Sequence, residues 1–267
     1  MNTLSIKKNG LFFQVIKSKH QSFWEDLNDG GWEPETFKVF DRFISQDVTY
    51  IDVGAWIGPT LLYAAQRAKA AFAFEPDPLA YQEMLANVQL NPEITNIQTY
   101  EALIGIESGK TRLGSRDEGG DSTSSVLFSE MKTSWLVESI NLPEFVEKQG
   151  LRSPLFIKID IEGGEYSLLP TLVNFFKNYQ PIVLYLSLHP EFLLIDPSSS
   201  QKLPLNLNRA IKLIKAHFDL AQSLVSFKYI YDIYGNRTSI WKGLFKALSG
   251  NNNMAENAII ATNQRWN

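Results

Sequence analysis

The sequence predicts an α/β fold with a Rossmann-like, seven-stranded, doubly wound sheet and helices on both faces. Two observations lead to this prediction. A strand, a glycine turn, a helix and a second strand follow one another over residues 48–74. A nearly continuous apolar run over residues 155–161 is typical of a parallel strand that is buried on both sides. The 267 residues, 44% of them hydrophobic, are enough for one such domain with a full core.

The first unit shows the pattern most clearly. Residues 48–53 are rich in β-formers, Gly54 and Gly58 relax the backbone at a turn, and residues 61–70 have helical composition. A second apolar run over 72–74 then ends in Glu75. Such a turn places bare amides and a helix N-terminus against a ligand.

An N-terminal elaboration over residues 1–44 precedes the core domain, which we place at 45–267. Alternating hydrophobicity on both sides of Asn9-Gly10 predicts a β-hairpin with a type I′ turn. Two helical stretches, over 22–27 and 35–44, complete the elaboration.

The remaining segments alternate between strand and helix patterns, and we found no internal repeat. A proline- and serine-rich insertion over 191–206 is the candidate substrate lid. The other predicted segments are a strand over 97–104, a polar loop over 108–125, a strand over 135–142, a helix over 143–149, a helix over 168–176, a strand over 182–188, a helix over 207–218, and strands over 226–233 and 257–262 that form an antiparallel edge pair.

Composition excludes several classes of function. A net charge of −4 gives no basic surface for nucleic acid. The absence of cysteine excludes disulfides, thiolate nucleophiles and zinc–cysteine clusters. Neither a signal peptide nor an apolar run long enough to span a membrane is evident, so we expect a cytoplasmic protein. The oligomeric state is not predicted.

The spacing of two acids predicts an adenosine site. Glu75 lies 23 residues after Asp52, close to the offset of about 20 residues at which an acid grips the ribose hydroxyls in dinucleotide folds. A diphosphate fits the turn poorly because Trp56 stands inside it, where G-x-G-x-x-G turns have glycine. Asp52 repels phosphate but attracts the ammonium and sulfonium groups of S-adenosylmethionine. The pattern therefore favours that cation.

Four segments resemble the FkbM family of S-adenosylmethionine-dependent methyltransferases. They are residues 51–58 (IDVGAWIG), 74–78 (FEPDP) with Asn87 and Asn91 downstream, 156–165 (FIKIDIEGGE) and 186–190 (LSLHP). The first two occur throughout the methyltransferase superfamily, whereas the order IKIDIEG is specific to the family. The resemblance implies a class I methyltransferase sheet and transfer to hydroxyls of sugars, glycans or natural-product scaffolds.

The predicted cofactor contacts lie at the ends of the first three strands. Asp52, Gly54 and Gly58 are assigned to the methionine end, Glu75 to the ribose, and Glu101 and Ala102 to the adenine. The full set of predicted cofactor residues is Asp52, Gly54, Ala55, Trp56, Gly58, Glu75, Pro76, Asp77, Glu101 and Ala102.

The predicted catalytic residues are Asp160, Glu162 and His189, which follow neighbouring strands and therefore converge at one edge of the sheet. His189 is a candidate general base, since imidazole titrates near neutral pH. A histidine that only bonds backbone at a strand end is an equal alternative. Asp160 alternatively pairs with Lys158 on the same face, and Glu162 and Glu165 alternatively stabilise a helix start.

A metal bound by these three residues is conceivable but less favoured than a metal-free site, because they form no contiguous ligand motif. In the polar loop, Asp121, Ser122 and Ser125 are possible contacts to cofactor or acceptor, or ordinary turn residues.

The sequence thus predicts an S-adenosylmethionine-dependent O-methyltransferase with a small-molecule or glycan acceptor. A nicotinamide-dependent oxidoreductase and a non-catalytic S-adenosylmethionine-binding protein are the alternatives. The absence of an Asn/Asp-Pro-Pro-Tyr/Phe motif after the strand at 155–161 disfavours methylation of planar nitrogens.

Overall fold

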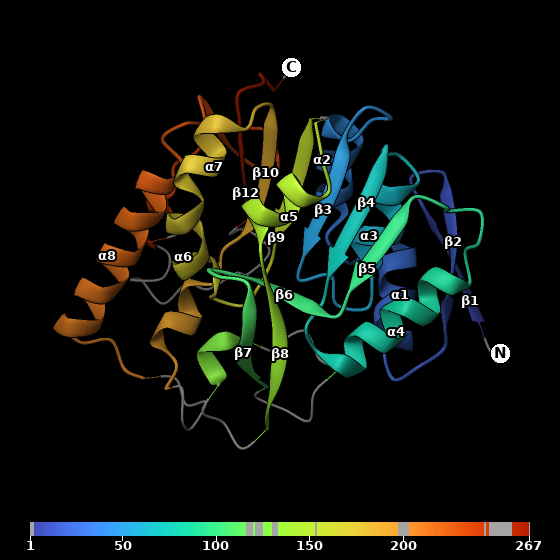
Figure 1. The fold of residues 1–267 in the computed structure, drawn as a ribbon, viewed down its shortest axis with the longest axis horizontal. Helices are drawn as coiled ribbons and strands as arrows, with labels where there is room; N and C mark the ends of the chain where they lie inside the picture. The colour runs from blue at the N-terminus through green and yellow to red at the C-terminus, as the bar shows by residue number, and fades with distance from the viewer. Residues whose placement is uncertain are drawn as a thin grey trace.

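The computed structural model describes residues 3–115, 120, 125–129, 133–152, 154–196, 203–242, 244–245 and 258–266. A seven-stranded sheet in the order β11-β12-β10-β9-β3-β4-β5 forms its centre (Figure 1). These strands are β3 (Thr49–Val53), β4 (Ala70–Phe74), β5 (Ile97–Tyr100), β9 (Leu155–Ile159), β10 (Ile182–Ser187), β11 (Tyr229–Asp232) and β12 (Ala258–Thr262). The predicted fold class is confirmed.

The predicted antiparallel pair forms one edge of the sheet. From β10 to β5 all neighbours pair in parallel, while β12 runs antiparallel to both β10 and β11. The antiparallel pair is therefore present, but β12 lies inside the sheet and only β11 is at the edge. All five residues of β12 are buried, as an internal strand requires.

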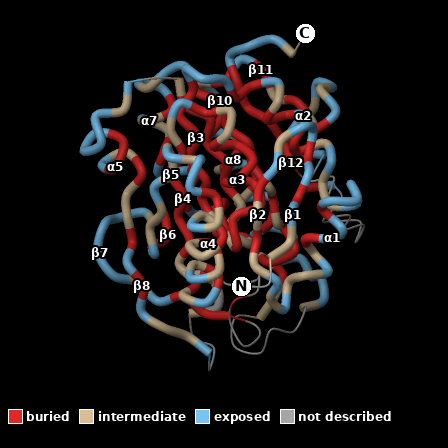
Figure 2. Tube along the Cα trace, turned by 90° about the vertical axis from the view of Figure 1, so that its right-hand side faces the viewer, coloured by how far each residue is buried: buried red, intermediate tan, exposed pale blue. Residues whose placement is uncertain are grey.

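Helices cover both faces of the sheet, and Figure 2 shows the buried strands between them. One apolar cluster joins one face to α2 (Pro34–Phe43), α3 (Pro59–Ala65) and α4 (Pro78–Gln89). A second cluster joins the other face to α5 (Leu142–Lys148), α6 (Glu165–Leu168), α7 (Val173–Asn178) and α8 (Leu207–Ser223). Side chains alternate along β3, so Tyr50 enters the first cluster and Ile51 and Val53 the second.

The N-terminal hairpin is present as predicted. Strands β1 (Thr3–Lys8) and β2 (Leu11–Ile16) pair antiparallel around Asn9 and Gly10, both with positive φ. Asn87 of α4 and Asn91, just beyond the end of α4, bond to the outer edge of β2. Asn87 Oδ1 accepts from the Ile16 amide at 2.8 Å, and Asn91 Oδ1 accepts from the Gln14 amide at 2.7 Å. The elaboration, which also contains α1 (Gln21–Asp29), is thus fixed to the core.

Two predictions for the segment between β5 and β9 were wrong. The predicted strand over 97–104 is divided at Glu101, and its second half, β6 (Ala102–Gly105), pairs with β8 (Ser134–Asn141). The predicted polar loop contains β7 (Gly109–Gly114), which completes a three-stranded sheet in the order β6-β8-β7. Polar composition concealed β7 because half of its six residues are exposed. Asp121 and Ser122 lie outside the described residues, as do positions 197–202 of the predicted lid.

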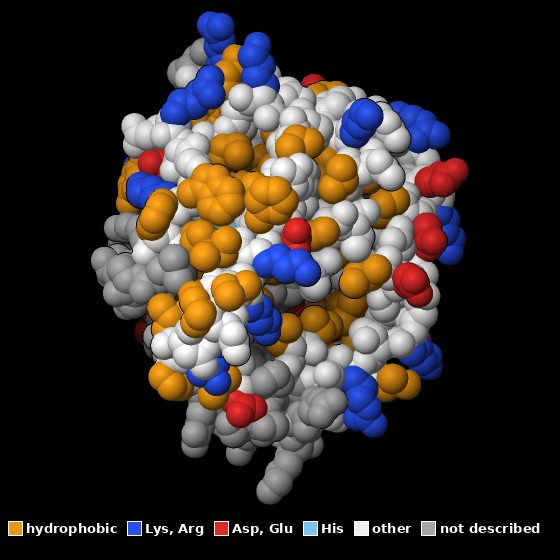
Figure 3. All heavy atoms as spheres, turned by 90° about the vertical axis from the view of Figure 1, so that its left-hand side faces the viewer, with side chains coloured by type: hydrophobic (Ala, Val, Ile, Leu, Met, Phe, Trp, Pro, Cys, Tyr) orange, Lys and Arg blue, Asp and Glu red, His pale blue; other side chains and the backbone are white. Residues whose placement is uncertain are grey.

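The outer side of α8 is apolar as well as exposed. Leu207, Ile211, Ile214 and Phe218 recur at helical spacing and remain at least 47% exposed. Figure 3 shows this side of the molecule, where hydrophobic side chains gather among lysines and arginines. Within the described part of the chain, no helix combines the length and the apolar character needed to cross a membrane.

Close packing at the first turn predicts a large difference between two glycines. Gly54 has φ +83°, and a Cβ there would lie 2.0 Å from the Asp160 carbonyl oxygen. Gly10 has nearly the same φ, +84°, with open space around it. We expect Gly54→Ala to lower the free energy of unfolding by more than about 3 kcal/mol, and Gly10→Ala by about 1 kcal/mol, in urea titrations followed by circular dichroism. Equal losses would show that the contact with Asp160 does not matter.

Candidate functional site

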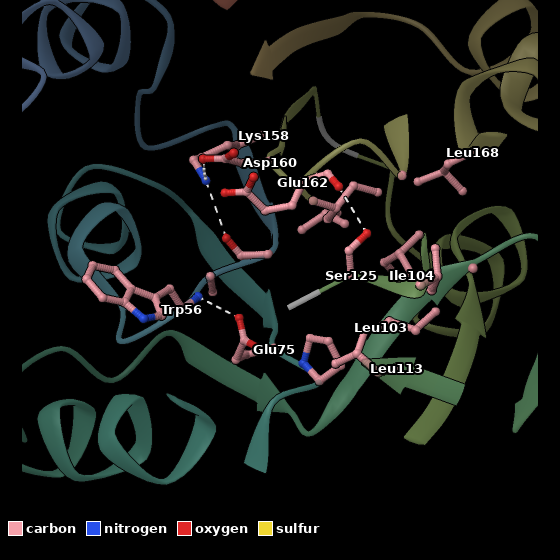
Figure 4. A pocket seen from close by; sticks show the side chains of 18 of the residues that line it. Trp56, Glu75, Leu103, Ile104, Leu113, Ser125, Lys158, Asp160, Glu162 and Leu168 are labelled. Atoms are coloured by element: carbon pink, nitrogen blue, oxygen red, sulfur yellow. Dashed lines mark hydrogen bonds and ion pairs between the residues drawn. The ribbon is translucent and has the colours of Figure 1, made fainter. Parts of the chain in front are cut away.

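A cavity of about 850 Å³ lies at the carboxyl ends of β3, β4, β9 and β10. The N-terminal elaboration contributes Phe23, Trp32 and Glu33 to its wall, so the cavity belongs to both parts of the chain. In the close-up of Figure 4, Trp56 and Glu75 lie below Lys158, Asp160 and Glu162. Apolar side chains line another side of the view: Leu103, Ile104, Leu113 and Leu168.

The turn after β3 and the end of β4 are joined through Glu75. Its carboxylate accepts from the backbone N–H of Trp56 at 2.7 Å and of Asp77 at 2.8 Å. Trp56 adopts φ +49°, and its ring packs edge-on against Phe23 of α1 at 4.7 Å between centroids. Trp56 therefore lines the cavity and also anchors the elaboration to the turn.

Burial raises the pKa of the Glu75 carboxyl to about 7, against the opposing effect of the two backbone N–H donors. Glu75 is only 7% exposed yet it lines the cavity. Its carboxylate is consequently poised near neutral pH and has lone pairs left for a ligand's hydroxyl groups.

Asp52 does not face the cavity, which corrects the prediction that it meets the donor directly. It is fully buried and absent from the cavity wall. One carboxylate oxygen accepts from the Thr60 hydroxyl at 2.8 Å, and the other lies 3.4 Å from the Lys158 ammonium. Burial raises the pKa of Asp52, while Lys158 opposes this. The alternation of β3 turns residue 52 to the same face as buried Tyr50, which explains the orientation.

The other predicted cofactor residues divide into two groups. Gly54, Ala55, Trp56, Glu75 and Pro76 line the cavity, whereas Gly58, Asp77, Glu101 and Ala102 do not.

The four residues that do not line the cavity have roles in the backbone and at helix ends, or lie at strand boundaries. Gly58 begins α3 with φ +90°. Asp77 caps α4 by accepting from the amides of Leu79 and Ala80. Glu101 is exposed where the chain leaves β5, and Ala102 is buried as the first residue of β6. Because the chain turns into the small sheet there, Leu103 and Ile104 reach the cavity instead.

The three predicted catalytic residues do converge. His189 Nε2 lies 3.6 Å from Asp160 Oδ1 and 4.0 Å from Glu162 Oε2. Lys158 lies 3.1 Å from the other Asp160 oxygen, so the alternative of a Lys158–Asp160 pair is also correct. Glu162, three residues after the end of β9, occupies a left-handed conformation with φ +51°. The Ser125 hydroxyl donates to its carbonyl oxygen at 3.0 Å.

Charge coupling sets the protonation of this cluster. Burial disfavours a charged His189, but the carboxylates of Glu165, Asp160 and Glu162 outweigh burial and raise its pKa to about 10. Burial raises the pKa of Glu162 to about 8, with His189 opposing. Burial acts likewise on Asp160, yet Lys158 holds its pKa below the usual value. His189 therefore keeps its proton at neutral pH, which differs from the state that a general base needs.

Sequence reasoning gave no role in the site to Glu33, named Glu165 only at a helix start, and named Lys158 only as a partner of Asp160. Glu165 is fully buried and lies 2.8 Å from His189 Nδ1, so it does more than stabilise a helix start. Lys158 lines the cavity from β9, on the face that strand alternation predicted it to share with Asp160. Glu33 lines the cavity from the start of α2 and accepts from the Thr36 hydroxyl at 2.9 Å. No sequence pattern connects Glu33 to the site.

The family model for the FkbM methyltransferase domain matches residues 52–210, which is more than half of the chain. The chain belongs to the FkbM methyltransferase family. This membership confirms S-adenosylmethionine as the cofactor predicted from the sequence. The match includes the glycine turn, Glu75 and the cluster around Asp160. No curated protein matches the sequence.

Several solved structures resemble this FkbM chain at low identity. A methyltransferase FkbM from Methylobacillus flagellatus is 15% identical with a TM-score of 0.47, over 81% of this chain and 44% of that one. SMU.776, a putative methyltransferase complexed with SAH, is 9% identical with a TM-score of 0.42, over 98% and 55%. Trm5b from Pyrococcus abyssi is 13% identical with a TM-score of 0.38, over 98% and 55%. The chain thus spans about half the length of these proteins.

The residues of the FkbM site fit the donor. Gly54 lines the cavity with bare backbone, because the Asp160 carbonyl oxygen fills the space that a Cβ would need. Glu75 presents a carboxylate suited to ribose hydroxyls, and Leu103 and Ile104 offer apolar surface for a base. The cavity volume also lies within the usual range for small-molecule sites, roughly 300 to 1,000 Å³.

The orientation of Asp52 predicts a structural effect of its removal. Asp52→Asn takes one of two carboxylates from the buried Lys158 ammonium, so we expect the free energy of unfolding to fall by about 2 kcal/mol. Asp29→Asn, at an exposed helix end, should change it by less than about 0.5 kcal/mol. Urea denaturation measures both. An Asp52→Asn protein with unchanged stability would contradict the pairing.

Proposed function

We propose that this FkbM protein transfers a methyl group from S-adenosylmethionine to a hydroxyl oxygen of a sugar, glycan or natural-product-like small molecule. The observation that carries the proposal is one cavity lined by the glycine turn, Glu75 and the cluster of Asp160, Glu162 and His189. A donor and an acceptor bound in one cavity can meet in line while water is kept away.

The donor end uses Gly54, Ala55, Trp56 and Glu75. Glu75 accepts from the ribose hydroxyls, and the bare backbone at Gly54 admits the donor close to the strand ends. When bound, S-adenosylmethionine supplies an electrophilic methyl carbon on a cationic sulfur. The nearby carboxylates favour that charge.

The acceptor end uses Asp160, Glu162 and His189. The Asp160 side chain is 29% exposed, and its Oδ1 is not occupied by Lys158. It can accept a hydrogen bond from an acceptor hydroxyl and take up its proton. His189 is held by Glu165 and orients the two carboxylates. Several acids around one cavity suit an acceptor with several hydroxyl groups.

The rival functions are less consistent with the site. A nicotinamide oxidoreductase needs a diphosphate turn, but Trp56 occupies that turn. A protein that only binds S-adenosylmethionine would not require Asp160 and Glu162 at the acceptor end. A nucleic acid acceptor is disfavoured by the net charge of −4. A cytoplasmic location remains a prediction from the sequence.

Binding and turnover together test the proposal. We expect calorimetric binding of S-adenosylmethionine without tight binding of NADH, and transfer of labelled methyl onto members of a panel of hydroxylated metabolites and glycans. Asp160→Asn should reduce turnover at least about 100-fold with little change in the Kd of S-adenosylhomocysteine. NADH binding without binding of S-adenosylmethionine would overturn the assignment.

The raised pKa of Glu75 predicts a pH effect on donor binding. The ribose hydroxyls need the carboxylate form, which is lost as pH falls through about 7. The affinity for S-adenosylhomocysteine should therefore drop about tenfold from pH 8 to pH 6. Glu75→Gln should bind more weakly and lose the pH dependence, while Glu101→Gln, an exposed acid after the next strand, should match the unmodified protein. An unaltered pH profile in Glu75→Gln would exclude Glu75 from this role.

A further inference from the structure

We propose that Asp160, Glu162 and His189 bind a divalent cation, which holds the acceptor by its oxygen atoms. This inference rests on the proposed function and adds the means by which the acceptor is held and activated. It reverses the preference for a metal-free site that the sequence indicated.

The three side chains offer three ligand atoms around one point. One atom from each residue lies within 4.8 Å of the other two. Nε2 of His189 is 3.6 Å from Asp160 Oδ1 and 4.0 Å from Glu162 Oε2. Ligands at 2.0–2.2 Å from one cation lie roughly 3 to 4 Å apart, so small movements are enough to complete the coordination.

Charged neighbours hold two of the three proposed ligands, His189 and Asp160, through the atoms that do not face the cation. Glu165, itself fully buried, lies 2.8 Å from His189 Nδ1 and directs Nε2 toward the two acids. A carboxylate behind a histidine is the usual outer support of a metal-bound imidazole. Lys158 occupies Asp160 Oδ2 at 3.1 Å and leaves Oδ1 to face His189. These contacts exist before any cation binds.

The backbone also fixes Glu162. Residues 162 and 163 both have positive φ, +51° and +88°, so the turn after β9 is strained at a non-glycine residue. Ser125 holds this turn through the carbonyl oxygen of residue 162. The turn places the Glu162 carboxylate 4.0 Å from His189, within the cavity wall.

The acids around His189 require a positive counter-charge. Carboxylates of Asp160, Glu162 and Glu165 surround this imidazole, while Lys158 compensates Asp160 and the buried Asp52. A proton on Nε2 and a divalent cation are alternative counter-charges for the same acids. Two carboxylates and one imidazole suit Mn²⁺, Mg²⁺ or Zn²⁺.

The cation explains how a hydroxyl acceptor is activated. Three protein ligands leave coordination positions open toward the cavity, and a hydroxyl bound there has a lowered pKa. With Asp160 Oδ1 on the cation, the carboxylate oxygen of Glu162 that does not bind the cation takes up the proton. An acceptor with two adjacent oxygens, such as a vicinal diol, fills two positions and is held in a fixed orientation. We therefore expect the acceptor to be a hydroxyl compound that can chelate the cation.

Binding of Mn²⁺ alone to the full chain tests the site. We expect one equivalent to bind in calorimetry and in electron paramagnetic resonance titrations. Asp160→Asn and His189→Asn should abolish this binding, and Glu165→Gln should weaken it about 10- to 100-fold. Glu83→Gln alters another histidine–carboxylate pair, His20–Glu83, and should leave Mn²⁺ binding unchanged. Circular dichroism shows whether each variant is folded.

Other outcomes separate this inference from the proposed function. No saturable binding of Mn²⁺, Mg²⁺ or Zn²⁺ at millimolar concentration, by protein that binds S-adenosylhomocysteine, would overturn the cation site alone. Mn²⁺ binding that survives Asp160→Asn and His189→Asn would also overturn it. Failure to bind S-adenosylhomocysteine or S-adenosylmethionine, with Mn²⁺ bound or not, would instead overturn the proposed function.

Discussion

The site depends on one buried ammonium group. Lys158 is 4% exposed and lies between Asp52 on β3 and Asp160 at the end of β9. Asp52 and Lys158 are register partners, and Tyr185 is the partner of Lys158 on β10. A buried lysine is costly unless it is paired, so these acids must stay in place for the strand ends to keep their geometry. Lys158 thereby holds Asp160 where His189 and Glu162 meet it.

The N-terminal elaboration forms and supports part of the cavity wall at the carboxyl edge of the sheet. Tyr185 bonds Thr36, and Thr36 donates to Glu33 in the cavity wall. At the other end, Phe23 packs on Trp56, whose amide donates to Glu75. Both ends of the cavity are therefore linked to the same segment of 44 residues. The family model begins only at residue 52, so this part of the cavity lies outside the shared domain.

Local sequence patterns predicted most of the fold. They failed where contacts between residues far apart in the sequence determine the structure. The strands, the hairpin and the convergence of Asp160, Glu162 and His189 follow from periodicity and from the rule that parallel strands end at one edge. The turn of the chain at Glu101 and the strand β7 depend on pairing with β8, which residue spacing does not reveal. Glu33 and Glu165 were missed for the same reason. Glu165 contacts His189, 24 residues away, and Glu33 reaches the cavity through Thr36, which bonds Tyr185, 149 residues further along the chain.

The acids of the whole cavity, and not Asp52 alone, favour a cationic donor. Asp52 is buried beneath the residues that line the cavity, and Lys158 compensates its charge. The acids that line the cavity are Glu33, Glu75, Glu107, Asp160 and Glu162, and they outnumber the basic residues Lys110, Lys158 and His189. Phosphate is therefore disfavoured by the whole cavity rather than by one residue of the turn. At both ends of the cavity a bound cation, the sulfonium of the donor or a divalent metal, would favour the ionised form of these acids.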